Sequence, residues 1–419
     1  MSDKSVPTES SWPYSGFLLL ILERYKWIHR RVETITFMPD QITQRRVSYD
    51  FTLPEIVGKL AVNGHVGVPL TNMKKEVLQN LSVTDATGKA LSVYGSDENA
   101  KIAIGILELF FDSVVMRKPQ EHELKWIKAI VHSDFGENAT EEIQNLRMVF
   151  EGESKKSKDF LDAVMAFVEE LADNFIFIVD LPAEVINSRS IVKVSYDKEL
   201  IANKDVLNLF TLGKEYSVEK RFFPTSASSH LEIKAPESAR ITKLVHVNSK
   251  GDWVDADFQE KGNVRGHIGH IKISKSDAYE TREIFELRPE LAGIVFQTWL
   301  GTLFAFLYFC SEFIGLHKID QLLPSIADIG PFAGVTLALP AFLLTLLVRV
   351  REHKSVRVLL RIPRAVASAT ALLLFISSAS LVLGLSPWEF RQCLLTVGLF
   401  QGILLAWMSV VAFNIQRSV

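Results

Sequence analysis

Cysteine is nearly absent from this sequence. Only Cys310 and Cys393 occur in 419 residues, and both lie inside long apolar runs near the C-terminal end. The first 289 residues contain none, which excludes a disulfide framework, a thiol nucleophile and a cysteine-containing zinc site from that part of the chain.

Catalytic motifs are missing as well. The sequence has no Gly-rich phosphate loop, no Gly-x-Ser-x-Gly nucleophile elbow and no His-Glu-x-x-His motif. The string His267-Ile268-Gly269-His270, followed by Lys272–Ser276, is similar to the two signature motifs of class I aminoacyl-tRNA synthetases. Those motifs belong to distant segments of a nucleotide-binding fold, whereas these are adjacent in one alternating strand, so we interpret the match as coincidence. We expect no enzymatic activity and no cofactor.

No metal site is predicted. His267 and His270 are three residues apart on an expected strand and therefore face opposite sides of it. The acidic loop with Asp252, Asp255, Asp257 and Glu260 departs from the spacing of calcium loops, so a solvated turn is the better interpretation. The pairs His122–Glu123 and His132–Asp134 lack a third partner.

The first 289 residues also lack an excess of positive charge. They hold 37 Lys and Arg against 43 Asp and Glu, a net charge of about −6. Nucleic-acid-binding domains usually carry a basic surface, so we predict no general nucleic-acid partner, although a local basic patch stays open.

A signal peptide is absent from the N-terminal stretch. Phe17–Leu22 is apolar for only six residues, acidic Asp3 and Glu9 precede it, and Glu23 and Arg24 follow it. This pattern predicts a buried strand or helix edge and no export signal.

The C-terminal third contains four apolar runs with almost no charge. They cover residues 292–315, 329–348, 365–385 and 393–413, and each is long enough to cross about 30 Å of hydrocarbon as a helix. Buried core helices would keep a polar face toward water, which these runs lack. The sequence therefore predicts a bundle of four transmembrane helices.

A basic segment separates the second and third runs. Its cations are Arg349, Arg351, Lys354, Arg357, Arg361 and Arg364, against the single acid Glu352. The positive-inside rule places this segment in the cytoplasm, with the N-terminal 289 residues and the C-terminus on the same side of a bacterial inner or plasma membrane. The segment only sets topology, or it also contacts anionic lipid or an acidic surface such as the N-terminal part.

Polar and small residues interrupt the apolar runs. Gln297, Glu312 and Gln401 are polar, and the third run has small residues at Ala367, Ala371, Ser380 and Gly384. Such residues either pack the four helices together, or form an interface between copies or the polar lining of a conduction path. Glu312 alternatively reaches the outer headgroups.

The remaining patterns divide the chain. We predict a disordered segment 1–15, a β-rich module 16–118, a helical insert 119–174, a second β-sandwich-like module 175–276, a juxtamembrane connector 277–290 and a transmembrane domain 291–419. Alternation predicts a half-buried strand at Arg45–Leu53, a hairpin over Leu81–Val93 and an antiparallel sandwich after residue 175, whereas Ile102–Phe111 favours a helix. The connector Ser276–Pro289 is compatible with a helix and lacks a Gly/Ser linker.

Together these features predict an α+β multi-domain membrane protein without a catalytic site. The main hypothesis is a cytosolic sensor coupled to a membrane-permeabilising or channel-like bundle, as in a prokaryotic antiviral or stress response. The expected partners are membrane lipids, further copies of the chain bound through the bundle, and an unknown cytosolic ligand or protein. The first alternative is a non-conducting scaffold that recruits a partner, and the second is an enzyme whose site is made of scattered Asp, Glu and His.

Overall fold

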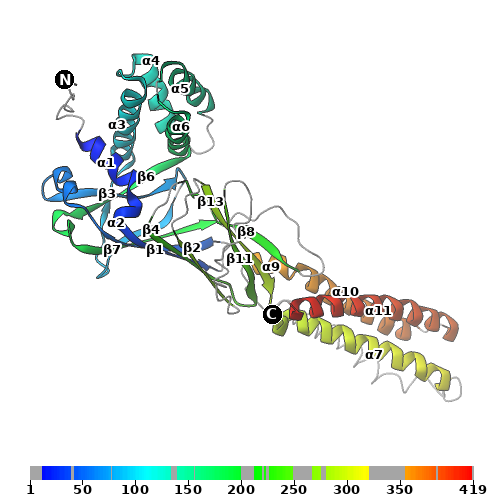
Figure 1. Ribbon diagram of the computed structural model, residues 1–419. Helices are drawn as coiled ribbons and strands as arrows, with labels where there is room; N and C mark the ends of the chain where they lie inside the picture. The colour runs from blue at the N-terminus through cyan, green and yellow to red at the C-terminus, as the bar shows by residue number, and fades with distance from the viewer. Residues whose placement is uncertain are drawn as a thin grey trace, which may run out of the picture.

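A computed structural model describes most of the chain. The described residues are 12–38, 42–76, 78–133, 139–154, 156–199, 212–218, 221–222, 226–248, 267–274, 280–319, 354–383 and 386–417. The molecule is elongated, with a helical unit and a β-rich part at one end and three long helices at the other (Figure 1). This arrangement confirms an α+β chain with apolar helices at its C-terminal end.

A six-stranded sheet forms the centre of the β-rich part. Its order is β12-β10-β1-β2-β7-β4. The strands are β1 (Ile28–Phe37), β2 (Ile42–Thr52), β4 (Gln79–Asp85), β7 (Arg189–Glu199), β10 (Ser228–Lys234) and β12 (Ile268–Ser274). The two ranges predicted as separate β modules contribute three strands each. The antiparallel pairing predicted within the second module holds for β10 with β12, whereas β10 also runs parallel to β1, a strand of the first module, with which no hairpin connects it.

Two smaller sheets cover one face of this sheet. The first contains β3 (His65–Lys74), β6 (Asn174–Pro182) and β5 (Ser92–Val93), and the second contains β11 (Ala239–Asn248), β13 (Glu280–Pro289), β8 (Lys214–Ser217) and β9 (Arg221–Phe222). Tyr49 and Phe51 share a core with Val68 of the first small sheet, while Phe37 packs with Phe285 of the second. Among the described helices and strands, none covers the opposite face of the six-stranded sheet, which we call the open face.

A helical unit lies beside the first small sheet. It consists of α1 (Trp12–Leu22), α2 (Arg24–Trp27), α3 (Ser96–Val115), α4 (Glu121–His132), α5 (Thr140–Glu153) and α6 (Lys158–Asp173). Ile106, Phe111, Ile130, Phe150 and Val168 belong to its buried core. The predicted helices at 102–111 and within 119–174 are confirmed, and α1 begins at Trp12, inside the segment expected to be disordered.

One local prediction is confirmed in part and another is wrong. Leu81–Val93 turns back at Asp85–Gly88 as a short hairpin, in which Thr84 bridges Ala90 and the Leu91 amide donates to the Val83 carbonyl oxygen at 2.9 Å, although Ser92–Val93 then pairs with β6 in another sheet. The connector is no helix: Glu280–Pro289 forms β13, since Phe285 and Leu287 alternate into the core and the strand lies between β11 and β8. Pairing with distant strands outweighs the helical compatibility of this charged segment.

Three helices are long and apolar enough to cross a membrane. They are α7 (Phe296–Ile319, preceded by the π-helical turn Leu291–Val295), α10 (Arg361–Val382) and α11 (Pro387–Arg417); the short α9 (Lys354–Leu359) precedes α10. They correspond to the predicted spans 292–315, 365–385 and 393–413. The predicted span 329–348 lies outside the described residues, so the described bundle has three helices.

Candidate functional site

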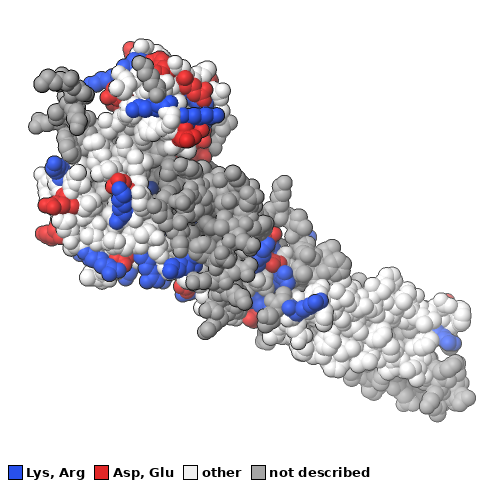
Figure 2. Space-filling view, in the orientation of Figure 1, with Lys and Arg blue, Asp and Glu red and all other residues white. Residues whose placement is uncertain are grey.

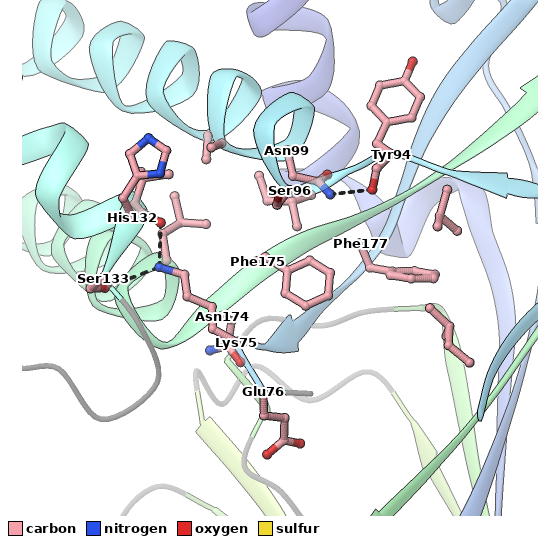
Figure 3. Close-up of a pocket in the computed structure, with 17 residues that line it drawn as sticks. Lys75, Glu76, Tyr94, Ser96, Asn99, His132, Ser133, Asn174, Phe175 and Phe177 are labelled. Atoms are coloured by element: carbon pink, nitrogen blue, oxygen red, sulfur yellow. Dashed lines mark hydrogen bonds between the residues drawn. The ribbon is translucent and has the colours of Figure 1, made fainter. Parts of the chain in front are cut away.

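A cavity of about 740 Å³ lies where the helical unit meets the β-rich part (Figure 3). Its walls come from α3, α4, α6, β4, β5 and β6, and they are mostly apolar, with Ala103, Val131, Leu171, Phe175 and Phe177 among the lining residues. Cavities of this size and lining are typical of sites for small apolar or amphipathic molecules. We call it the junction pocket.

Lys75 is the one lysine among the described residues that line the junction pocket, and its ammonium group already has partners. Lys75 Nζ donates to the carbonyl oxygens of Ile130 (3.2 Å) and Val131 (2.8 Å) and lies 3.4 Å from Ser133 Oγ. These groups are at the end of α4, where helix carbonyls lack helical donors. Lys75 thus fastens α4 to the end of β3, and Figure 3 shows its ammonium beside Ser133.

The other polar groups of the junction pocket are few. Asn99 Nδ2 donates to the carbonyl oxygen of Tyr94 at 3.0 Å, and Glu76 forms an ion pair with Lys198. Among the described residues, no group of three or more His, Cys, Asp or Glu side chains could hold a metal ion. This arrangement suits binding, and the sequence patterns gave no signal for it because its walls come from six separate segments.

A buried ionic network ties the helical unit to the first small sheet. Arg24 Nε donates to the Pro69 carbonyl oxygen and its Nη2 to Asn72 Oδ1, both at 3.1 Å, while Asn72 Nδ2 donates to Glu170 Oε1 at 2.7 Å. Burial lowers the pKa of Arg24 to about 10, although the charge of Glu170 opposes this shift. Burial also raises the pKa of Glu170, against the effects of the Asn72 bond and the Arg24 charge. The network therefore links α2, β3 and α6.

The β-rich part continues into the bundle without an irregular linker. Strand β13 is paired up to Pro289, the Glu290 amide donates to the Ser238 carbonyl oxygen, and the π-helical turn begins at Leu291. Gly293 has non-helical backbone angles (φ −91°, ψ −138°) and bends the chain where α7 starts. A strand is thus joined directly to a candidate span.

One hydrophobic core crosses this junction. Its buried members include Phe37 of β1, Phe285 of β13, Val295, and residues of α9 and α11 such as Leu359 and Val411. Arg240 of β11 also donates a hydrogen bond to the Ile415 carbonyl oxygen near the end of α11. The start of α7, the start of α10 and the end of α11 therefore all lie against the β-rich part (Figure 1).

The predicted basic segment lies partly at this junction. Val356, Leu359 and Leu360 of the segment are buried in the shared core, whereas Arg357 and Arg361 are exposed and Arg364 is half-buried. Lys354 starts α9, and Arg349 and Arg351 lie outside the described residues. The apolar side chains of the basic segment thus pack on the β-rich part, whereas those of Arg357 and Arg361 are exposed.

The bundle has a polar centre near the middle of its three helices. Gln401 of α11 is fully buried, and its Nε2 donates to the Thr302 carbonyl oxygen of α7 at 3.0 Å and to Thr370 Oγ1 of α10 at 3.3 Å. Thr302 Oγ1 donates to the Thr298 carbonyl oxygen at 2.7 Å. Gln401 Oε1 has no hydrogen-bond partner in the described part of the chain. We call Thr302, Thr370 and Gln401 the polar triad.

The other intramembrane residues singled out from the sequence lie apart from the polar triad. Gln297 is exposed on α7, and Glu312 accepts a hydrogen bond of 2.5 Å from the Tyr308 hydroxyl one turn earlier. Ala367, Ala371 and Ser380 are buried against the other helices, and Gly384 lies outside the described residues. The small residues of α10 thus face the interior of the described bundle.

The histidines of the synthetase-like string point to different partners. His267 lies 3.0 Å from both Glu290 Oε1 and the Ala239 carbonyl oxygen, whereas His270 Nε2 lies 3.2 Å from His230 Nδ1 on β10. Asp252, Asp255, Asp257 and Glu260 lie outside the described residues.

The comparisons with known proteins identify no relative. No protein-family model matches the chain, and no curated protein matches it. The junction pocket, the shared core and the polar triad are therefore the features of this chain that bear on its function.

Proposed function

We propose that this chain is a multi-pass membrane protein in which the β-rich part senses a ligand or protein and the bundle responds by changing membrane permeability. The observation that carries the proposal is the single hydrophobic core shared by β1, β13, α9 and α11. Packed cores have few alternative arrangements, so a shift of β13 would move the start of α7 with it.

The junction pocket supplies the sensing end of this proposal. It lies between the helical unit and β6, and the network of Arg24, Asn72 and Glu170 holds the same two parts together. A ligand that binds more tightly when the helical unit and β6 have one particular separation would shift the population toward that conformation.

The polar triad supplies the responding end. Buried amide and hydroxyl groups in a membrane are expensive and usually functional, and here three helices meet at one such group. We propose that the helices rearrange around Gln401 when the bundle opens.

The test is dye and ion release from liposomes that contain the full-length chain. We expect release by the wild type, strong loss in Gln401→Leu, and no loss in the matched variant Gln297→Leu, whose side chain is exposed on α7. Absence of release from wild type and variants alike, across lipid compositions and candidate triggers, would leave the non-conducting scaffold as the function.

The proposed orientation places the β-rich part, the basic segment and the C-terminus in the cytoplasm of a bacterial cell. Both native cysteines are replaced by alanine, and single cysteines are introduced at Ser355 and Ser386. An impermeant thiol reagent applied to intact cells should label the second position and spare the first. The reverse labelling would contradict this orientation.

A scaffold that recruits a cytosolic partner is the second candidate, favoured by the open face of the six-stranded sheet. A fragment cut before β13 would lose the central strand of a sheet, so this candidate is tested on the whole chain. Pull-down from native membranes should then yield a partner whose capture is unaffected by Gln401→Leu.

A further inference from the structure

We propose that two copies of this chain bind side by side through two different surfaces. Helices α5 and α6 of one copy lie on the open face of the six-stranded sheet of the next. The open face consists of the outward-pointing residues of β1, β2, β7, β10 and β12. The proposal goes beyond the proposed function, because it holds whether or not the bundle conducts.

The open face carries positive charge that the face itself does not neutralise. Lys193 lies opposite Ser48, Arg46 opposite both Thr34 and Ser195, and Lys272 opposite His230. All three cations are exposed, and none has an ion pair to a described carboxylate. The sheet therefore presents a row of exposed cations across several strands.

Two of the described acids of this face are paired with cations, and a third, Asp197, is bonded to an uncharged amide and keeps its charge. Asp50 pairs with Arg189 at 2.6 Å, Glu232 pairs with Lys234 at 3.3 Å, and Asp197 accepts a hydrogen bond from Asn80. The pKa of His230 is lowered, first by burial and then by the positive charges of Arg30 and Lys272. The exposed cations without ion pairs and the lowered pKa of His230 both indicate a positive electrostatic potential on this face.

The complementary surface belongs to the same chain. Residues 119–174 hold 13 Asp and Glu against six Lys and Arg, a net charge of −7, so the rest of the first 289 residues is near neutral. Glu141, Glu151, Asp159 and Asp162 of α5 and α6 are exposed and have no ion pair to a described cation. Figure 2 shows acidic residues together with some basic ones over the helices, and mainly basic residues along the lower margin of the β-rich part.

The two surfaces are placed so that copies can meet. The helical unit and the open face lie on opposite sides of the β-rich part, at overlapping levels along the long axis (Figure 1). Copies whose bundles lie in one membrane have parallel axes, so the side of one copy faces the side of its neighbour. A contact between different surfaces is heterologous and produces rings or rows.

Other anionic partners fit the open face less well. Its described residues include no Phe, Tyr or Trp, the side chains on which single-stranded nucleic acids stack. The face also runs along the long axis and not across the end that meets the bundle, so a flat bilayer does not cover it (Figure 1).

Charge reversal in full-length protein tests the contact. Arg46→Glu with Lys193→Glu reverses two charges of the open face, and Glu151→Lys with Asp162→Lys reverses two charges of α5 and α6. We expect the wild type to assemble at low salt and to dissociate at about 0.5 M salt, because screening weakens exposed charge pairs. Each reversed variant alone should assemble at least about tenfold more weakly by light scattering in detergent.

Mixing the two reversed variants provides the decisive measurement. The unchanged α5 and α6 of the first variant can still bind the unchanged open face of the second, so mixing should restore pairing, which also shows that both variants are folded. The matched control, Lys101→Glu with Lys118→Glu, changes charge equally at exposed positions outside both surfaces and should assemble like the wild type.

A second readout uses introduced cysteines. Ser48→Cys in one tagged copy should form a disulfide with Met148→Cys in another, because these positions lie on the open face and on exposed α5. Assembly that is unchanged by charge reversal, or not restored by mixing, overturns the proposal. Binding of polyanionic RNA that Arg46→Glu with Lys193→Glu abolishes, without any self-assembly of the wild type, overturns it as well.

Discussion

Two buried polar clusters lie in different parts of the molecule and differ in charge. Between the helical unit and the first small sheet, Arg24 is 3% exposed and Glu170 is 9% exposed. Two ionisable groups are thus removed from water there and joined through Asn72. In the bundle, the polar triad consists only of hydroxyl and amide groups around Gln401. We expect the ionic network to be destabilised more by the loss of its cation than the uncharged triad is by the loss of one member.

The physical reason is the cost of an unpaired charge. Removing one partner of a buried ion pair leaves the other charge without compensation, which destabilises by about 3–5 kcal/mol. A hydrogen bond between uncharged groups in a helix bundle contributes only about 0.6–2 kcal/mol. We therefore expect the loss of Arg24 to destabilise the chain more than the loss of Gln401 or Thr370.

The largest effect is expected for Arg24→Ala. It leaves the Pro69 carbonyl oxygen and Asn72 Oδ1 without this donor and Glu170 without its cation, so we expect a loss of about 3–5 kcal/mol. Urea unfolding followed by tryptophan fluorescence measures it. The control Arg30→Ala removes an exposed arginine and should change the unfolding free energy by less than about 0.5 kcal/mol. Equal losses in the two variants would show that the network is not a unit.

The sequence predicted the two clusters unequally. Gln401 stands out because a polar residue interrupts an apolar run, but the same pattern singled out Gln297, which is exposed, so the pattern does not predict which of the two is buried. Arg24 gave no such signal, since its partners Pro69, Asn72 and Glu170 are far from it in sequence. Strand β2 was predicted from its alternation, whereas β13 was missed because pairing with β8 and β11 decides its structure.

The second effect is expected in the bundle. Gln401→Leu removes both bonds of Nε2 and the unpaired Oε1, so we expect a loss of about 1–2 kcal/mol, partly offset because no unpaired acceptor is left at that position. Unfolding in mixed micelles with increasing denaturing detergent measures it. Gln297→Leu, on the exposed side of α7, should be nearly neutral. A loss above about 3 kcal/mol would mean that the polar triad behaves like an ionic cluster.

The pH dependence of Glu170 gives a smaller effect with a defined sign. Its pKa is raised above 4.5 in the folded chain, so the folded state binds this proton more tightly than the unfolded state. The contribution of Glu170 to stability therefore falls as pH rises from the ordinary carboxyl range through the folded pKa.

Glu170→Gln isolates this contribution, because the amide oxygen can still accept from Asn72 Nδ2 and carries no charge. We expect the variant to have the higher unfolding midpoint at pH 8, with the difference shrinking toward pH 4. A difference that grows as pH falls would instead show that the Arg24 charge outweighs burial at this site.

The smallest effect is expected for Thr370→Val. It removes the 3.3 Å bond to Gln401 Nε2, while the 3.0 Å bond from Nε2 to the Thr302 carbonyl oxygen remains, so we expect a loss of about 0.6 kcal/mol. In the double variant with Gln401→Leu, the two losses should sum to more than the measured total, because both single changes remove the same bond. Strict additivity would mean that Thr370 stabilises the bundle through its other contacts, namely packing and the Thr302 hydroxyl 3.5 Å from its own. The bundle would then contain a single amide held by one backbone carbonyl, and its contrast with the ionic network would be sharper.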